Sequence, residues 1–251
     1  MKKGPAVSIV LPNYNSFKFI NSTIKSIIKQ SYTNWKLIII DDCSDKKTRD
    51  LLVKITKNKK IKIYWLKKNR GAGYCRNLAV KKSHSKYIAF IDSDDIWKKN
   101  KLKNQINFME KNNLDFTYTS YEIFGDKKKS VFPPEKLNYK QFLGNTSIAT
   151  STMILKYNII KNAKFTNTEI CEDYFFKCKI LKNINYAYCL NKILTKYRIR
   201  RNSLQSNNLK NLYWIWNINK NFNKLNVFQN LISLFSISLN SFKRYGLKNL
   251  F

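Results

Sequence analysis

Short hydrophobic runs alternate with polar segments over the first half of the chain. Residues 6–11, 35–40 and 87–91 are short, largely apolar runs, which is typical of parallel strands buried on both faces. Residues 61–66 alternate apolar and polar positions, as a half-buried strand does. These four segments are the predicted strands of a central sheet.

The segments that separate and follow these strands are predicted to be helical. Apolar side chains recur every three to four positions in residues 17–30 and 96–112, and residues 48–57 and 73–82 are the other two predicted helices. Alternating strands and helices indicate an α/β fold, with a Rossmann-like, mostly parallel sheet flanked by helices on both faces. Ligands of such sheets bind at the carboxyl ends of the strands.

The pattern becomes less regular from Asp115 onward. We predict a polar loop over residues 125–139, a helix over 172–181, and strands at 116–124, 150–155 and 193–198. Residues 207–251 are mostly of helical character, and neither a repeat nor a linker is visible. The chain is therefore predicted to comprise one main domain, residues 1–206, and a helical C-terminal extension, residues 207–251.

The composition limits the class of protein without naming a partner. Of 251 residues, 43% are hydrophobic and 14% aromatic, which suffices for a folded core. The formal net charge of +33 has two interpretations: attraction to polyanions or an anionic membrane, and a compositional bias toward Lys, Asn and Ile. Five cysteines without a CxxC pair argue against a disulfide framework or a zinc site, and no signal peptide or spanning segment is visible. We therefore expect a cytoplasmic protein.

Three sequence motifs follow predicted strands and carry candidate chemistry. Residues 90–95 read Phe-Ile-Asp-Ser-Asp-Asp, and clustered carboxylates at a strand end suit Mg²⁺ or Mn²⁺, although a solvated turn that caps the next helix is the alternative. Asp41 and Asp42 follow the second strand, where a carboxylate can accept from a nucleotide base or ribose, or simply cap a turn. Residues 69–77 hold two glycines before a helix, and Arg76 could reach a diphosphate or be an ordinary surface arginine.

The order and spacing of four segments resemble family 2 inverting glycosyltransferases with the GT-A fold. These segments are the Val7–Asn15 strand end, the Asp-Asp turn, the Gly-x-Gly loop and the Asp-Ser-Asp-Asp motif. The resemblance covers roughly residues 6–205 and implies a catalytic domain that binds a nucleotide diphosphate sugar. It implies that the nucleotide base lies near Pro12, Tyr14 and Asp42 and the ribose or donor sugar near Asp92. It also implies that Asp94 binds the Mn²⁺ or Mg²⁺ cofactor.

The same resemblance implies a catalytic base after the acidic motif. Cys171-Glu172-Asp173 is similar to the family's Glu-Asp pair at a helix start, which makes Asp173 the base and gives Glu172 an orienting role. An inverting transfer requires one carboxylate to take the proton of the acceptor hydroxyl. Without the resemblance, the two carboxylates are equally explained by their favourable position on the helix dipole.

Residues 197–203 resemble the Tyr-Arg-x-His segment that follows the base in many family members. Arg200 stands where those relatives have histidine, and arginine pairs with phosphate but does not ligate cations. Arg198 and Arg200 are therefore predicted to bind substrate, with a solvated basic strand end as the alternative.

Sugar transfer to a lipid-linked or saccharide acceptor, in bacterial surface-polysaccharide or lipopolysaccharide synthesis, is what the resemblance implies. A nucleotidyltransferase would more naturally carry a basic, glycine-rich loop after the first strand, where this chain has Pro12 to Asn15. A nucleic-acid-binding module would concentrate its charge, whereas these lysines are scattered, so we expect no specific nucleic-acid partner.

The C-terminal extension combines aromatic and aliphatic side chains with basic ones, and its longest apolar run, residues 227–242, is too short and too polar to span a bilayer. Such a helix suits the anionic inner face of the cytoplasmic membrane as a peripheral contact. The alternative is that the extension packs on the main domain or in a dimer.

Overall fold

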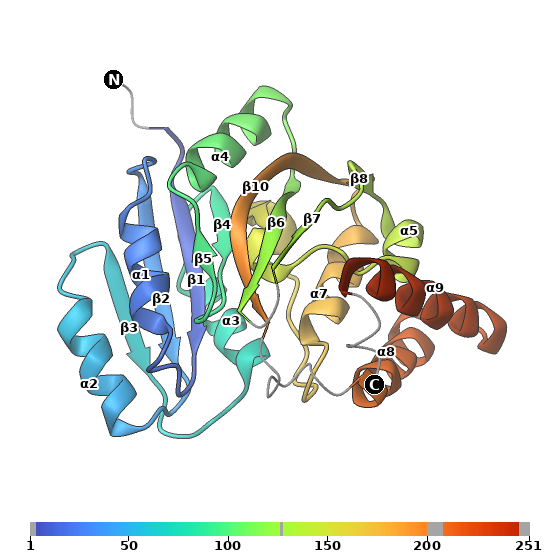
Figure 1. The fold of residues 1–251 in the computed structure, drawn as a ribbon, viewed down its shortest axis with the longest axis horizontal. Helices are drawn as coiled ribbons and strands as arrows, with labels where there is room; N and C mark the ends of the chain where they lie inside the picture. The colour runs from blue at the N-terminus through green and yellow to red at the C-terminus, as the bar shows by residue number, and fades with distance from the viewer. Residues whose placement is uncertain (1–3, 126–127, 200–207, 246–251) are drawn as a thin grey trace.

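A computed structural model describes residues 4–125, 128–199 and 208–245. Its sheet has the strand order β3-β2-β1-β4-β9-β6-β10-β5, with β7 paired to β6 and β8 to β10 (Figure 1). The strands are β1 Val7–Asn13, β2 Trp35–Asp41, β3 Ile61–Trp65, β4 Tyr87–Phe90, β5 Ile96–Trp97, β6 Phe116–Gly125, β7 Lys129–Val131, β8 Lys136–Leu137, β9 Ile154–Lys156 and β10 Ala187–Ile199.

Helices cover both faces of this sheet. They are α1 Ile20–Ile28, α2 Lys46–Ile55, α3 Ala72–Lys81, α4 Lys101–Lys111, α5 Tyr139–Gly144, α6 Tyr157–Ile160, α7 Glu172–Leu181, α8 Asn208–Ile218 and α9 Val227–Tyr245, with a 3₁₀ turn at Thr150–Thr152 and a π-helical turn at Asn219–Asn223. The strands β1 to β4 pair in parallel, as the sequence predicts, whereas β9 runs antiparallel to both β4 and β6. The sheet is therefore mixed, and its longest pairings, β1 with β2 and β6 with β10, are parallel as predicted.

Alternation along β1 shows how one strand serves two cores. Val7, Ile9 and Leu11 face the core that contains α1, α2 and α4. Val10 faces the second core, to which α3, α5 and α7 contribute. Because successive side chains of a strand point to opposite faces, a strand buried between two cores needs apolar residues on both of its faces.

One predicted helix begins later than expected. Residues 96–112 were predicted to be helical throughout, but Ile96 and Trp97 form β5 and pair antiparallel with β10. The α4 helix therefore begins at Lys101. Backbone pairing with a strand about a hundred residues away overrides the local periodicity, and it fixes the segment after the acidic motif to β10.

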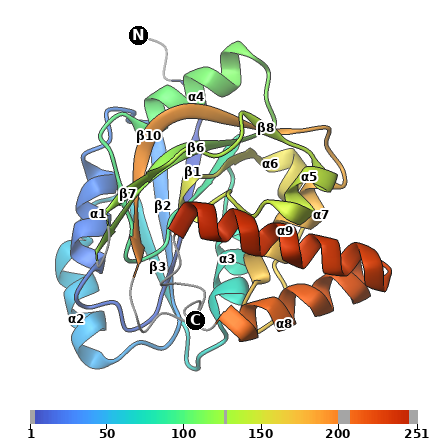
Figure 2. The same cartoon turned by 45° about the vertical axis from the view of Figure 1, so that its right-hand side comes forward.

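The C-terminal extension packs on the α3 and α7 side of the sheet (Figure 2). In Figure 2, α9 lies across α5, with α8 below it. Asn219, which is fully buried, joins the helices: Tyr174 Oη donates to its Oδ1 at 2.8 Å, and its Nδ2 donates to Asn230 Oδ1 and Ser233 Oγ at 3.0 Å each. Hydrogen bonding thus holds the extension together with the apolar packing of Ile215, Ile218 and Ile237 in the core.

Replacing Asn219 with alanine should destabilise the protein, since it leaves buried polar partners unsatisfied. We expect Asn219→Ala to lower the free energy of unfolding by about 2–3 kcal/mol. Urea unfolding followed by circular dichroism measures the change, with Asn221→Ala, an exposed residue of the same π-helical turn, as the matched control. Equal midpoints for the two variants would contradict a structural role for the buried amide.

Candidate active site

The acidic motif forms a tight turn at the carboxyl end of β4. The Asp95 amide donates to the Asp92 carbonyl at 3.2 Å, and the Asp92 amide donates to Ser151 Oγ at 2.9 Å. The strand before the turn is completely buried, whereas Asp92 and Asp94 are partly exposed. The turn therefore presents two carboxylates at the edge of the sheet where ligands of parallel sheets bind.

Arg198, near the end of β10, holds the acidic turn from the other side. Its amide donates to Asp95 Oδ1 at 2.8 Å, and its Nε donates to the Asp94 carbonyl at 3.0 Å. The guanidinium carbon lies 4.6 Å from the ring centre of Phe19 and 4.2 Å from that of Phe124. Arg198, predicted to bind substrate, thus stabilises the acidic turn in this structure. Arg200 lies outside the described residues.

Asp95 is buried in the turn, and its Oδ2 has no hydrogen-bond partner. Burial, together with the nearby Asp94 and Asp92 carboxylates, raises the pKa of Asp95 well above its usual range. The turn therefore concentrates negative charge that a cation would relieve.

A divalent cation would fit this turn if it were held jointly by the protein and the phosphates of a bound ligand, and not enclosed by protein side chains. No group of three or more His, Cys, Asp or Glu side chains within residues 4–125, 128–199 and 208–245 converges to hold a metal. Mg²⁺ and related ions are commonly held by one or two carboxylates, with phosphates and water completing the shell. The orphaned Asp95 oxygen and the partly exposed Asp94 match that donor set.

Asp42 ties the Gly-x-Gly loop to the end of β2. Its Oδ1 accepts from the Arg70 amide at 2.7 Å and its Oδ2 from the Gly71 amide at 2.8 Å. Gly71 has a φ of +83°, a left-handed conformation that glycine adopts without strain. Asp42, predicted to bind the nucleotide base, therefore also holds the loop in its conformation. Its oxygens can accept further hydrogen bonds beyond these two.

The end of β1 lies beside Asp42. Residues 12 and 13 pair with residues 40 and 41 of β2, and the fully buried Asp41 accepts from Asn13 Nδ2 at 2.8 Å. Pro12 is partly buried, and Tyr14 has 53% of its surface exposed. The structure thus brings Pro12, Tyr14 and Asp42 to one edge, next to the acidic turn on β4.

Arg76 differs most from the sequence-based expectation. We expected a guanidinium that reaches a diphosphate, but its Nη2 donates to Asp92 Oδ1 at 2.7 Å and its Nη1 to Glu172 Oε1 at 2.6 Å. The residue is only 5% exposed. Arg76 therefore bridges the acidic turn to the start of α7 because two carboxylates flank it, a partner set that local sequence cannot reveal.

Gly73 allows this bridge to close. A Cβ at this position would lie 2.4 Å from the Thr166 carbonyl oxygen and 3.2 Å from Glu172 Cγ. A backbone oxygen cannot move aside as a flexible side chain would. The absence of a side chain at residue 73 thus lets α3 approach the segment that leads into α7.

The predicted base, Asp173, lies at the start of α7 with two partners. Its Oδ2 accepts from Lys177 Nζ at 2.6 Å and from Thr150 Oγ1 at 2.9 Å. Burial opposes its charge, but Lys177, Arg76 and the Thr150 hydroxyl outweigh burial and lower the pKa of Asp173 to about 2. Asp173 is therefore ionised at neutral pH.

Glu172 has the opposite electrostatic environment. Burial raises the pKa of Glu172, and the neighbouring Asp173 adds to that effect, although Arg76 acts against it. One oxygen is held by Arg76, which suits the orienting role expected for this residue. Two adjacent carboxylates with pKa values shifted in opposite directions are a frequent feature of active sites.

Sequence reasoning missed three residues of this site. Lys177 is four residues after Asp173 and so on the same helix face, a spacing that could have indicated the ion pair. Thr150 and Ser151 come from a 3₁₀ turn, and no local pattern connects them to Asp173 or Asp92. Only the folded chain brings them there.

Known proteins resemble this chain in sequence over most of its length. Residues 8–176 match the family described as Glycosyl transferase family 2. The chain is 34% identical over 226 residues to a Bacillus subtilis protein named as a teichuronic acid biosynthesis glycosyltransferase, covering 88% of this chain and 90% of that one. It is 37% identical over 216 residues to the Escherichia coli UDP-Glc:alpha-D-GlcNAc-diphosphoundecaprenol beta-1,3-glucosyltransferase, covering 84% of each chain.

The fold also matches a solved glycosyltransferase. A mannosyltransferase of Pyrobaculum calidifontis, in complex with GDP-Man and Mn²⁺, superimposes with a TM-score of 0.72 over 98% of this chain and 72% of that one. At 12% sequence identity the likeness concerns the fold alone. The family match and the relatives settle membership, and the chain belongs to glycosyl transferase family 2.

Proposed function

We propose that this glycosyltransferase moves a sugar, with inversion, from a nucleotide diphosphate sugar to a hydroxyl of a lipid-linked saccharide in bacterial surface-polysaccharide synthesis. The observation that carries the proposal is the Asp92–Arg76–Glu172 bridge, which places the acidic turn beside the ionised Asp173. The two relatives support the acceptor class through their names, one for teichuronic acid and one for a diphosphoundecaprenol-linked saccharide.

Each residue of the site has a proposed task. Pro12, Tyr14 and Asp42 line the edge that would hold the base and ribose of the donor, and Asp92 would contact the ribose or donor sugar. Asp94, with the donor's phosphates, would hold Mn²⁺ or Mg²⁺, which when bound neutralises charge on the departing diphosphate. Asp173 would accept the proton of the acceptor hydroxyl, with Thr150 and Lys177 fixing the carboxylate.

The helix α9 supports a peripheral membrane location because it exposes most of its large apolar side chains. Its protein-facing side carries the buried Asn230, Ser233 and Ile237, with Leu234 packed on the same core. The opposite side exposes six large apolar residues, whose spacing places them in a single stripe: Phe228, Leu231, Ile232, Phe235, Leu239 and Phe242. We define these six residues as the α9 stripe.

Basic residues at both ends of α9 match an anionic bilayer. Lys220 and Lys224 precede the helix, and Lys243 and Arg244 lie in its last turn. Each basic group near an anionic surface contributes about 1 kcal/mol, in addition to the burial of the stripe among acyl chains. Within the described residues no helix is long and apolar enough to cross a membrane. We propose that the helix lies in the membrane interface, on the cytoplasmic face.

Asp173→Asn should remove transfer and preserve donor binding, because the amide keeps the carboxylate's shape and lacks its basicity. A positioned general base contributes roughly 10²–10⁴-fold, so kcat should fall by at least about 100-fold. Transfer of radiolabelled sugar measures kcat, and titration calorimetry measures donor affinity. A variant that retains a third of wild-type kcat would refute the assignment.

Asp94→Asn should weaken the cation dependence of donor binding, since it removes a charged oxygen ligand at little steric cost. The ratio of UDP affinities with and without Mn²⁺ should be at least about tenfold smaller in the variant than in the wild type. Calorimetric titration with and without Mn²⁺ measures the change, and Asp50→Asn, an exposed carboxylate on α2, is the control. An equal Mn²⁺ effect in all three proteins would rule out Asp94 as ligand.

The α9 stripe should bind phosphatidylglycerol vesicles in a salt-sensitive manner. Burying one phenylalanine contributes about 1.5–3 kcal/mol, so Phe228→Ser with Phe235→Ser should reduce cosedimentation by at least about tenfold. Val53→Ser, which alters an apolar residue 63% exposed on α2, is the control. A wild-type chain that stays in the supernatant and forms a dimer lost in the double variant would instead identify a second copy as the occupant of the stripe.

A further inference from the structure

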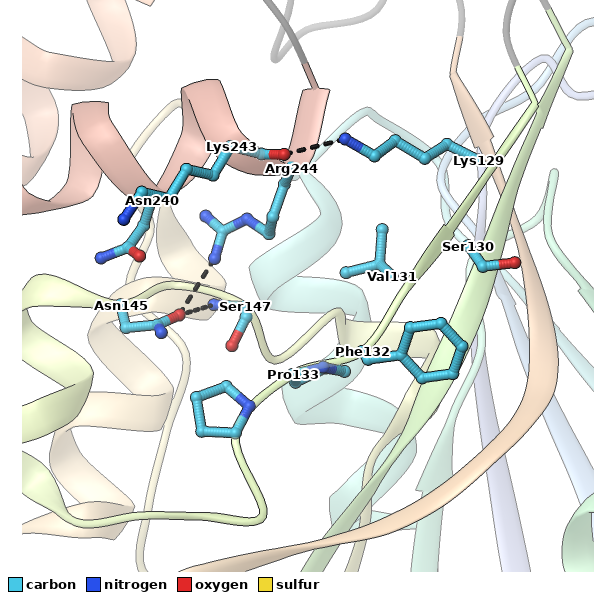
Figure 3. A pocket seen from close by; sticks show the side chains of 11 residues that line it. Lys129, Ser130, Val131, Phe132, Pro133, Asn145, Ser147, Asn240, Lys243 and Arg244 are labelled. Carbon is cyan, nitrogen blue, oxygen red and sulfur yellow. Dashed lines mark hydrogen bonds between the residues drawn. The ribbon is translucent and has the colours of Figure 1, made fainter.

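A basic cavity of about 440 Å³ opens where the end of α9 meets β7 (Figure 3). Three cations line it: Lys129 from β7, and Lys243 and Arg244 from α9. None of the described residues that line the cavity is acidic. The end of a helix carries about half a negative charge, which three full cations exceed. The cavity is thus suited to an anion.

The cavity has a built polar wall. Arg244 Nη1 donates to Asn145 Oδ1 at 3.0 Å, and the Ser147 amide donates to the same oxygen at 3.1 Å. Ser147 is 2% exposed, and its Oγ has no hydrogen-bond partner, although it lines the cavity (Figure 3). A buried hydroxyl without a partner is costly unless a ligand or water satisfies it.

The cavity is connected to the proposed active site by a short segment. Asn145 and Ser147 line the cavity, and Thr150, three residues further along, donates to Asp173. Val131 of the cavity also packs in a cluster with Tyr121 and Ile123, against which Ala149 and Tyr197 lie. The segment 145–150 thus links the wall of the cavity to the residue that donates to Asp173.

The chemistry of the cavity selects the part of an acceptor that would bind there. It combines cations and an unsatisfied hydroxyl with the 63%-exposed ring of Phe132, and the α9 stripe runs along the same helix that supplies Lys243. A phosphate group attached to a hydrocarbon chain satisfies all of these features, whereas a neutral saccharide satisfies none of the cations.

We propose that this cavity binds the diphosphate of a prenyl-diphosphate-linked acceptor, while the acceptor's sugar lies at Asp173 and its prenyl chain follows the α9 stripe into the membrane. The inference rests on the proposed function, since it assumes an acceptor of that class. Lys129 and Lys243 would bind the phosphates, and Ser147 Oγ would donate to a phosphate oxygen. Arg244 would act as a positioning residue that holds the segment containing Asn145 in place.

The test measures binding of farnesyl diphosphate by titration calorimetry, with UDP and Mn²⁺ at saturation so that the donor site is filled. Two charge-assisted contacts are removed in Lys129→Ala with Lys243→Ala, so affinity should fall about tenfold or more. Ser147→Ala should cause a smaller loss of about threefold. Lys57→Ala with Lys59→Ala makes the same change in net charge at the exposed turn after α2 and should bind as the wild type does.

Two further measurements distinguish a lipid-linked diphosphate from a free one, and the cavity proposal from the proposed donor site. Inorganic diphosphate should bind at least about tenfold more weakly than farnesyl diphosphate, because it lacks the chain that the apolar surface would bury. Equal affinity for both probes, or unchanged affinity in the Lys129 and Lys243 double variant, would overturn the inference. Binding of UDP with Mn²⁺ is read separately: its failure refutes the donor site, whereas normal UDP binding without farnesyl diphosphate binding refutes the cavity assignment alone.

Discussion

The site depends on one buried guanidinium group, that of Arg76. Arg76 joins Asp92, which follows β4, to Glu172, which begins α7, and its own helix α3 begins after the loop that Asp42 holds. Since arginine does not lose its proton in a protein, this charge is permanent. Removing one partner of a buried ion pair typically costs about 3–5 kcal/mol. The fork of Arg76 therefore fixes the spacing between the acidic turn and the proposed base, and a lysine, with one nitrogen, could not span both carboxylates in the same way.

The same arrangement sets the charge state of Asp173, the proposed base. Lys177 and Arg76 keep its carboxylate charged despite burial, at a pKa of about 2. As the proposed base, such a carboxylate would be available in its charged form at neutral pH but would attract a proton only weakly. Glu172 differs: burial raises its pKa, and Arg76 binds one of its oxygens.

Local sequence was sufficient for the parts of the fold in which one strand and one helix alternate. The pattern of residues 6–91 predicted β1, β2 and β4 because strands buried on both faces are largely apolar, and β3 because a half-buried strand alternates. It failed at Ile96 and Trp97, where pairing with β10 decides the structure. The acidic turn, the Gly-x-Gly loop and the Glu172–Asp173 pair were identifiable as motifs. The Arg76 bridge and the Thr150 contact were not, because their partners are 16 to 96 residues away in the chain.

The C-terminal helix is where sequence periodicity and burial diverge most. A stripe of Phe, Leu and Ile side chains normally predicts the face that packs on the protein, yet in α9 that stripe is exposed and Asn230 and Ser233 are buried. Hydrogen bonds from Asn219, and from Ser233 Oγ to the Leu143 carbonyl at 2.7 Å, orient the helix together with the packing of Leu234 and Ile237 on the core. The α9 stripe takes no part in that packing and would be available for acyl chains. Because Lys243 and Arg244 end the same helix at the cavity, a membrane-bound α9 would hold the cavity close to the level of lipid phosphates. One helix would then set both the height of the enzyme and the place where the acceptor's charged group enters.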